Sequence, residues 1–201
     1  MTPVTDHYFT AEPASPADLR PLGASLAGRT VALHTARGVF SPDRVDVGTG
    51  VLLRLAPPPP TEGDLLDLGC GWGPIALSLA MRSPLARVWA VDVNERALDL
   101  ARRNAADLDL PHVTAARPDD VPADLRFTGL WSNPPIRVGK PALHELLLRW
   151  LPLLSPGAPA YLVVQRNLGS DSLQAWLGDQ GWPTSRFASD KGFRVLEVRG
   201  R

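Results

Sequence analysis

The stretch that decides the fold is Asp67-Leu68-Gly69-Cys70-Gly71-Trp72-Gly73-Pro74. The apolar pair 65–66 precedes it and the apolar run 75–80 follows, which predicts a buried strand, a glycine turn and a helix. Closely spaced glycines let the backbone turn tightly and approach a ligand, and Pro74 suits a first helical turn. A dinucleotide fingerprint would need glycine at position 74, so a pyrophosphate loop is disfavoured. An ordinary strand-to-helix turn is the alternative.

The composition is that of one globular domain. The chain has 201 residues, of which 44% are hydrophobic and 21% charged, enough for one substantial core. The single cysteine, Cys70, fits a reducing compartment, and four scattered histidines form no metal-ligand pair, so we expect no metal. The first residues show no signal-peptide pattern and no run is long enough to span a membrane. We therefore expect a cytoplasmic protein.

The charge is balanced overall and uneven along the chain. Twenty-one Lys and Arg residues equal 21 Asp and Glu residues, which argues against a protein that coats nucleic acid nonspecifically. The segment 136–201 carries the positive excess. A basic segment of this kind could bind phosphate groups, although an excess of positive charge more often marks a solvent-exposed surface.

The residues before the glycine stretch predict an arm and a small β extension. Residues 1–28 are rich in Pro, Ala and Ser, and we interpret them as an irregular N-terminal arm. Alternation at 29–34 predicts a strand, and 38–41 could supply a second one. A helix-like run at 51–56 is ended by four prolines at 57–60, which form a stiff spacer.

From Asp64 onward, strands and helices alternate, which predicts an α/β fold with a mostly parallel sheet and helices on both faces. We expect the ligand beyond the carboxyl ends of the strands. The predicted strands are 65–68, 87–91, 112–115, 130–132, 160–164 and 194–198, and the predicted helices are 75–82, 96–108, 142–154 and 172–180.

Two carboxylates stand where a nucleoside ligand would meet this sheet. Asp92 ends the second strand of the alternation, where its oxygens could accept hydrogen bonds from both hydroxyls of a ribose. Its spacing to Glu95 also fits a helix capping box. Asp67 would face the amino-acid end of a ligand, or would accept backbone N–H groups and so tie the loop together.

Trp131-Ser132-Asn133-Pro134-Pro135 ends the fourth strand. The two prolines remove two donors and force Asn133 into an extended backbone, which holds its amide rigidly with acceptors exposed. The Asn133 side-chain oxygen and the Pro134 carbonyl could bind both hydrogens of an exocyclic amine and steer its nitrogen toward the transition state. In isolation this sequence is more often only a loop.

Together, 67–73, Asp92 and 132–135 resemble the class I S-adenosylmethionine-dependent methyltransferases of the small-domain type. Phe40-Ser41, Asp46-x-Gly48-Thr49 and the segment 136–140 are similar to the relatives of 16S ribosomal RNA guanine-N2 methyltransferases. The resemblance covers roughly 29–199 and implies a doubly wound, Rossmann-like sheet of seven strands, mostly parallel, with the last strand reversed. We assign residues 1–28 to the arm and residues 29–201 to the methyltransferase domain.

The resemblance also implies roles for individual residues. S-adenosyl-L-methionine would be held by Gly48, Thr49, Asp67, Gly69, Cys70, Gly71, Gly73, Asp92, Val93 and Asp119. The catalytic set would be Asn133, Pro134 and Pro135, and the residues facing the substrate would be Ile136, Arg137 and Lys140.

Three departures from the family pattern affect the substrate half of the site. The well-studied ribosomal enzymes carry two tandem domains, and this chain matches only the catalytic one. Ile136 stands where many amine methyltransferases have an aromatic ring, so stacking on the target base would come from Trp131, Phe9 or Phe193. The acid that meets the adenine amine could be Asp119 or Asp120.

The resulting hypothesis is methyl transfer to an exocyclic amine, with guanine N2 of ribosomal RNA as the first choice. The phosphate contacts would come from Arg137, Lys140, Arg166, Lys191 and Arg194. The alternatives are methylation of a protein glutamine side chain, methylation of a small metabolite, and a domain that binds cofactor or RNA without turnover. The oligomeric state stays open.

Overall fold

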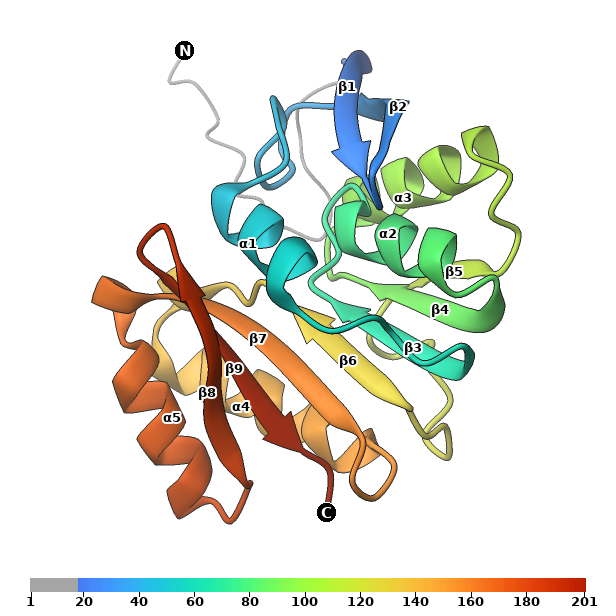
Figure 1. Cartoon of the computed structure of the whole chain (residues 1–201). Helices are drawn as coiled ribbons and strands as arrows, with labels where there is room; N and C mark the ends of the chain where they lie inside the picture. The colour runs from blue at the N-terminus through green and yellow to red at the C-terminus, as the bar shows by residue number, and fades with distance from the viewer. Residues whose placement is uncertain (1–17) are drawn as a thin grey trace.

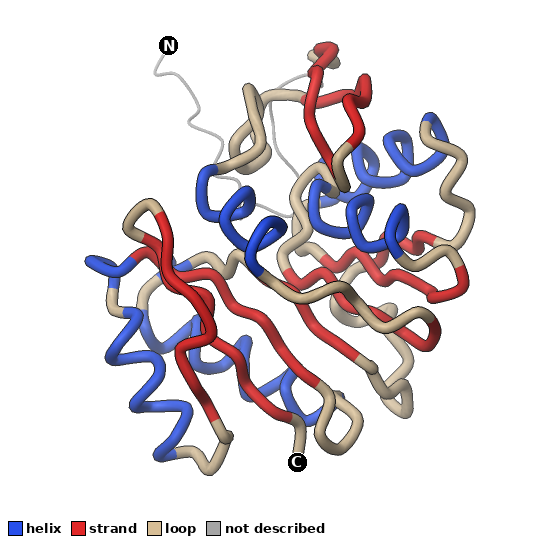
Figure 2. The backbone as a smooth tube through the Cα atoms, viewed as in Figure 1, coloured by secondary structure: helices blue, strands red, loops and turns tan. Residues whose placement is uncertain are grey.

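The chain folds around one seven-stranded sheet with a two-stranded hairpin beside it (Figures 1 and 2). A computed structural model describes residues 18–201. The elements are β1 (Arg20–Leu26), β2 (Arg29–Thr35), α1 (Val47–Leu55), β3 (Glu62–Leu68), α2 (Pro74–Arg82), β4 (Leu85–Val91), α3 (Glu95–Asp107), β5 (Val113–Ala116), β6 (Gly129–Ser132), α4 (Lys140–Trp150), β7 (Pro159–Gln165), α5 (Ser170–Asp179), β8 (Thr184–Asp190) and β9 (Phe193–Arg199), with short 3-10 helices η1 (Ile136–Val138), η2 (Leu151–Leu153) and η3 (Arg166–Leu168).

The large sheet has the strand order β5-β4-β3-β6-β7-β9-β8. The pairs β3 with β4, β4 with β5, β3 with β6 and β6 with β7 are parallel. Strand β9 runs antiparallel to both of its neighbours, β7 and β8. The expected seven-stranded, mostly parallel sheet with a reversed last strand is therefore confirmed.

The strand order reverses between β3 and β6. The chain moves outward from β3 to β4 and β5, then returns to β6 on the other side of β3. The hydroxyl of Ser132, the last residue of β6, donates to the Leu68 carbonyl at the end of β3, at 2.7 Å. The loops that follow these two strands therefore start side by side, at the place where open α/β sheets bind ligands.

Helices cover both faces of the sheet (Figure 1). On one face, buried side chains of α1, among them Val51 and Leu52, pack on β7 and β9, and those of α2, among them Leu79, pack on β3 and β4. On the other face, α4 and α5 bury Leu147, Trp150 and other apolar side chains against β6, β7 and β9. Because β3 contributes side chains to both clusters, the site at its carboxyl end stands on a strand that is buried on both faces.

The N-terminal hairpin corrects two expectations. Strand β1 pairs antiparallel with β2 from Arg20 to Leu26, inside the segment interpreted as an irregular arm. Residues 38–41, expected as a second strand, form a turn and bend. The hairpin buries Leu26 and Leu33 against α2 and α3, which explains why alternating residues of a Pro- and Ala-rich segment form a strand. Residues 1–17 of the predicted arm lie outside the described residues.

The other predicted strands and helices from residue 64 onward are confirmed to within a few residues at each end. Strand β8 was not predicted. It lies at the edge of the sheet, most of its residues are exposed or half-buried, and a bulge interrupts it between Arg186 and Ala188. Because no residue of β8 is buried, its sequence lacks the alternation of apolar and polar residues that predicts a strand.

Candidate active site

The glycine stretch forms the loop between β3 and α2. Gly69, Gly71 and Gly73 have φ angles of 76°, 54° and 96°, a region that residues with a Cβ rarely adopt. A Cβ built on Gly69 or Gly71 would meet no atom within 4 Å, so this side of the loop is open. A Cβ on Gly73 would lie 3.4 Å from the Ala101 side chain of α3. The first two glycines therefore leave room for a ligand, and the third allows close packing between helices.

Asp67 lies fully buried beneath this loop. Its Oδ2 accepts the Ala76 backbone N–H at 2.8 Å, while its Oδ1 has no hydrogen-bond partner among the described residues. Burial raises the pKa of Asp67 to about 8, against the lowering effect of the Ala76 hydrogen bond. A buried oxygen without a partner is costly, and a cationic group of a ligand would satisfy it.

Asp92, at the end of β4, holds the glycine loop from the other side. Its Oδ2 accepts the Gly71 N–H and its Oδ1 accepts the Asn94 N–H, both at 2.9 Å. Burial raises the pKa of Asp92, and the backbone hydrogen bonds oppose that shift. The helix cap of α3 is Asn94, whose side chain accepts the N–H groups of Arg96 and Ala97. The capping-box interpretation of Asp92 is therefore wrong.

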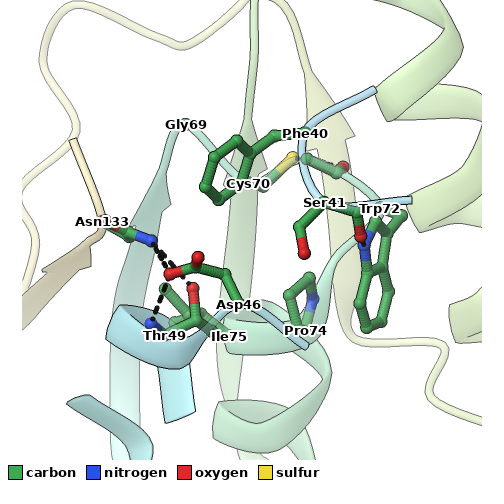
Figure 3. Close-up of a pocket in the computed structure, with 11 residues that line it drawn as sticks. Phe40, Ser41, Asp46, Thr49, Gly69, Cys70, Trp72, Pro74, Ile75 and Asn133 are labelled. Carbon is green, nitrogen blue, oxygen red and sulfur yellow. Dashed lines mark hydrogen bonds between the residues drawn. The ribbon is translucent and has the colours of Figure 1, made fainter. Parts of the chain in front are cut away.

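Asn133 follows β6 and faces the start of α1 across the pocket. Its Nδ2 donates to the Asp46 Oδ2 at 2.9 Å and to the Thr49 Oγ1 at 3.1 Å. Figure 3 shows this nitrogen directed at both oxygens. The Asn133 Oδ1 has no hydrogen-bond partner within residues 18–201. The amide thus keeps one free group, an acceptor.

The glycine loop, the start of α1 and Asn133 line one common pocket (Figure 3). The turn before α1 closes its remaining side, and the Trp72 Nε1 donates to the Ser41 carbonyl of that turn at 3.1 Å. The Phe40 side chain is 39% exposed over the pocket. The pocket is lined by Phe40, Ser41, Asp46, Thr49, Gly69, Cys70, Gly71, Trp72, Pro74, Ile75 and Asn133.

The two prolines continue from Asn133 into η1. The Pro134 carbonyl accepts the Ile136 N–H at 2.8 Å, and its second lone pair is available to another donor. Ile136 and Lys140 line a second hollow, between α4 and α5, where the Lys140 Nζ donates to the Ser172 Oγ at 3.1 Å. The Arg137 side chain lies outside what the structure describes.

Of the predicted cofactor residues, Thr49, Gly69, Cys70 and Gly71 line the pocket, while Asp67 and Asp92 lie beside the glycine loop. Asp119 is exposed and pairs with Arg149 at 2.7 Å, and neither Asp119 nor Asp120 lines the pocket. Val93 is 42% exposed next to Asp92. The roles assigned to Asp119 and Val93 in cofactor binding stay predictions.

Trp131 is not available to stack on a base. It is 2% exposed, and its ring packs on Tyr161 with the ring centroids 5.7 Å apart. Phe193 is half-buried against Gly48, where a Cβ would lie 2.8 Å from its ring. Phe9 lies outside the described residues.

The cations proposed to contact phosphates differ in availability. Arg194 forms an ion pair with Asp171 and is only 13% exposed, whereas Arg166 and Lys191 are exposed. Both exposed cations lie near the carboxyl end of β7. Because β6 and β7 are parallel, this is the same end of the sheet as the Asn133 loop.

Two features of the site are not predicted by the sequence. Asp46, which the sequence indicates only as part of a motif, caps α1 through the N–H groups of Gly48 and Thr49 and holds Asn133. An aspartate before an apolar helical run predicts such a cap, but its contact with a residue 87 positions away has no local signal. The Phe40-Ser41 turn was likewise not predicted to line the pocket.

The site fits the cofactor that the resemblance implies. An open glycine cradle, a buried carboxylate with a free oxygen and a second carboxylate at the end of β4 suit a ligand with an amino-acid end and a sugar. No group of three or more His, Cys, Asp or Glu side chains within residues 18–201 is placed to hold a metal ion. None of the helices in the same range is long and apolar enough to cross a membrane.

Known proteins are similar to this chain in sequence. The Bacillus subtilis protein YbxB is 29% identical over 199 residues, which cover 98% of this chain and 99% of that protein. Ribosomal RNA small subunit methyltransferase C of Pseudomonas aeruginosa is 32% identical over 196 residues, 94% of this chain and 57% of that enzyme. The chain thus spans the full Bacillus protein and little more than half of the Pseudomonas enzyme.

A solved structure and a family model agree with this fold. The T. thermophilus 16S rRNA N2 methyltransferase RsmC, solved in complex with AdoMet and guanosine, superposes with a TM-score of 0.78 at 24% identity, covering 94% of this chain and 52% of that one. The model of the methyltransferase small domain matches residues 30–197. With that match across most of its length and the site described above, the chain belongs to the methyltransferase small domain family.

Proposed function

We propose that this methyltransferase transfers a methyl group to an exocyclic amino nitrogen, and that the target is guanine N2 in ribosomal RNA. The observation that carries this proposal is the Asn133 amide. Its nitrogen is engaged by Asp46 and Thr49, and its oxygen, which accepts no hydrogen bond within residues 18–201, lies at the edge of the pocket that the glycine loop forms.

The methyl donor is S-adenosyl-L-methionine, which supplies an electrophilic methyl group carried on sulfur. The Oδ1 of Asp67 would accept a hydrogen bond from the ammonium group of the donor. Gly69 and Gly71 leave room for the donor along the backbone of the glycine loop. Asp92 would accept from the ribose hydroxyls through lone pairs that its two backbone hydrogen bonds leave free.

Asn133 and Pro134 would hold the acceptor. An exocyclic amine is a poor nucleophile because its lone pair is delocalised into the ring or carbonyl. The Asn133 Oδ1 and the Pro134 carbonyl can each accept one of its hydrogens, which favours a pyramidal nitrogen with its lone pair directed at the methyl group. Alignment of the two reactants would supply much of the acceleration. The nitrogen would gain the methyl group and lose one hydrogen as a proton to solvent, and the donor would leave as the thioether S-adenosylhomocysteine.

The choice of ribosomal RNA is supported by the relatives and by the basic C-terminal segment. The Pseudomonas relative is a ribosomal RNA small subunit methyltransferase, and the Thermus structure contains guanosine. Lys140, Arg166 and Lys191 are exposed in residues 136–201. A guanine in RNA would have to be unstacked to reach the pocket, which favours a loop or an unpaired base.

A protein glutamine is the second candidate, because its carboxamide has the same two hydrogens and the balanced charge of the chain suits a protein partner. The assay that distinguishes the two candidates offers tritiated donor to 30S subunits and to ribosomal proteins separately. We expect label in RNA. Label in protein alone would favour the glutamine reaction.

Two variants separate donor binding from transfer. We expect Asp92→Ala to weaken S-adenosyl-L-methionine binding by about tenfold or more in calorimetry, since it removes the ribose acceptor and the Gly71 contact. Asn133→Ala should bind the donor normally and lose at least about a hundredfold in transfer rate. No donor binding by the wild-type protein would overturn the proposal.

A further inference from the structure

We propose that Asp46 and Thr49 are positioning residues that determine which way round the Asn133 amide points. This inference rests on the proposed function of Asn133 and adds to it the reason why the amide presents oxygen rather than nitrogen. The two side chains lie 87 and 84 positions from Asn133 in the sequence and contact it across the pocket.

The chemistry of the partners fixes the orientation. A carboxylate has no hydrogen to give, so the group that faces the Asp46 Oδ2 at 2.9 Å must be the amide NH₂. Its second hydrogen is directed to the Thr49 Oγ1 at 3.1 Å. With both hydrogens engaged, Oδ1 is the group left for the target amine. A flipped amide would place oxygen against the carboxylate and a donor against the amine hydrogens.

The α1 N-terminus holds these partners rigidly. The Asp46 Oδ2 also accepts the N–H groups of Gly48, at 2.7 Å, and Thr49, at 3.2 Å, as the cap of the helix. Thr49 is 3% exposed in the first turn. One carboxylate oxygen therefore joins the helix cap to the Asn133 loop, and its negative charge polarises the amide so that Oδ1 becomes a stronger acceptor.

Gly48 is part of the same arrangement. A Cβ at this position would lie 3.0 Å from the Asp46 Oδ2 and 2.8 Å from the Phe193 ring. In the segment Asp46-x-Gly48-Thr49, the first and last residues accept hydrogen bonds from the Asn133 amide. The absence of a Cβ at Gly48 leaves room for the Asp46 carboxylate and the Phe193 ring. In this account the segment acts on the methyl acceptor through Asn133, in addition to the role toward the donor that the family resemblance implies.

The test compares Thr49→Val, which removes the hydroxyl at constant shape, with Thr49→Ser, which keeps it. We expect Thr49→Val to lower kcat by about tenfold, because one hydrogen bond to the Asn133 amide is lost while the backbone N–H that Asp46 caps is untouched. Thr49→Ser should recover most of that rate. In an Asn133→Ala background Thr49→Val should cost nothing further, because it acts through the amide.

A second readout needs no activity. In protein labelled with ¹⁵N-asparagine, the side-chain NH₂ signal absent from Asn133→Ala belongs to Asn133. We expect slow solvent exchange of that NH₂ in the wild type and exchange at least about tenfold faster in both Thr49→Val and Asp46→Ala. Thermal melts of both variants check that the fold persists.

The outcomes separate this inference from the proposed function. Fast NH₂ exchange in the wild type, or a Thr49→Val rate equal to wild type, would overturn the positioning role. The NH₂ hydrogens of Asn133 could instead exchange slowly in the wild type and faster in Thr49→Val, while the protein methylates neither RNA nor protein. That result would support the orientation of the amide and overturn the proposed function.

Discussion

The Oδ2 of Asp67 accepts the Ala76 N–H at 2.8 Å, while the Oδ1 of the same buried carboxylate has no partner within residues 18–201. The hydrogen bond anchors β3 to the first turn of α2. Burial raises the pKa of Asp67 to about 8, so most of this carboxyl group is protonated at pH 7. A cation bound beside its free oxygen would favour the ionised form, so the protonation of Asp67 depends on what the glycine loop binds.

Donor binding should therefore release a proton. The ammonium of S-adenosyl-L-methionine favours ionised Asp67, so about one proton should leave per donor bound at pH 7, and Kd should tighten about tenfold from pH 6 to pH 7. Calorimetry in buffers of different ionisation enthalpy measures the proton. In Asp67→Asn the proton release should disappear. If Asp67→Asn released as many protons per bound donor as the wild type, the proton would come from a group other than Asp67.

The stability of the donor-free protein should fall with rising pH. The folded-state pKa of Asp67 lies above the ordinary aspartate value of 3.8, so the folded state binds more protons than the unfolded chain. This contribution is fully present below pH 4 and is lost as pH rises through about 8. Urea titrations at pH 5, 6, 7 and 8 should show a smaller loss in Asp67→Asn than in wild type. Parallel curves would contradict the assignment.

Two glycines of α1 should respond oppositely to alanine. Gly48→Ala places a Cβ against Phe193 and the Asp46 Oδ2, so we expect lower stability and slower methyl transfer. Gly50→Ala is the matched control, since its Cβ meets nothing within 4 Å, and the gain in helix propensity should stabilise the protein by up to about 1 kcal/mol. Thermal melts and kcat measure both effects. Equal behaviour would contradict the close contact.

The turn before α1 should depend on Trp72. Trp72→Phe removes the hydrogen bond to the Ser41 carbonyl, and we expect donor Kd to rise by about three- to tenfold as the pocket wall loosens. Trp182→Phe is the control, because Trp182 is equally buried and its Nε1 has no partner among the described residues. Because Trp182 lies outside the pocket, Trp182→Phe should leave donor Kd unchanged, and an unchanged Kd in Trp72→Phe as well would contradict the role of the Ser41 contact.

The features read correctly from the sequence are those with a local cause. The glycine loop, the strand before it and the Pro-bounded Asn133 loop follow from backbone restrictions that each residue imposes on its neighbours. Burial on both faces made β3, β6 and β7 apolar enough to recognise. The parallel order then placed the two loops together.

The features missed depend on tertiary contacts. Strand β1 is stabilised by packing of its hairpin on α2 and α3, which its Pro- and Ala-rich sequence does not reveal. Trp131 illustrates the same difficulty at a single residue, because its ring is buried against Tyr161 and cannot stack on a base. The contact between Asp46 and Asn133 crosses 87 positions and could not be predicted from either segment alone.

The most direct test of the account is the identity of the methylated product. Ribosomal RNA from cells that lack the protein is incubated with purified protein and S-adenosyl-L-methionine labelled with tritium in its methyl group, digested to nucleosides and separated. We predict label in N2-methylguanosine with wild-type protein and at least about a hundredfold less with Asn133→Ala. Label in any other nucleoside, or equal N2-methylguanosine from Asn133→Ala, would contradict the account.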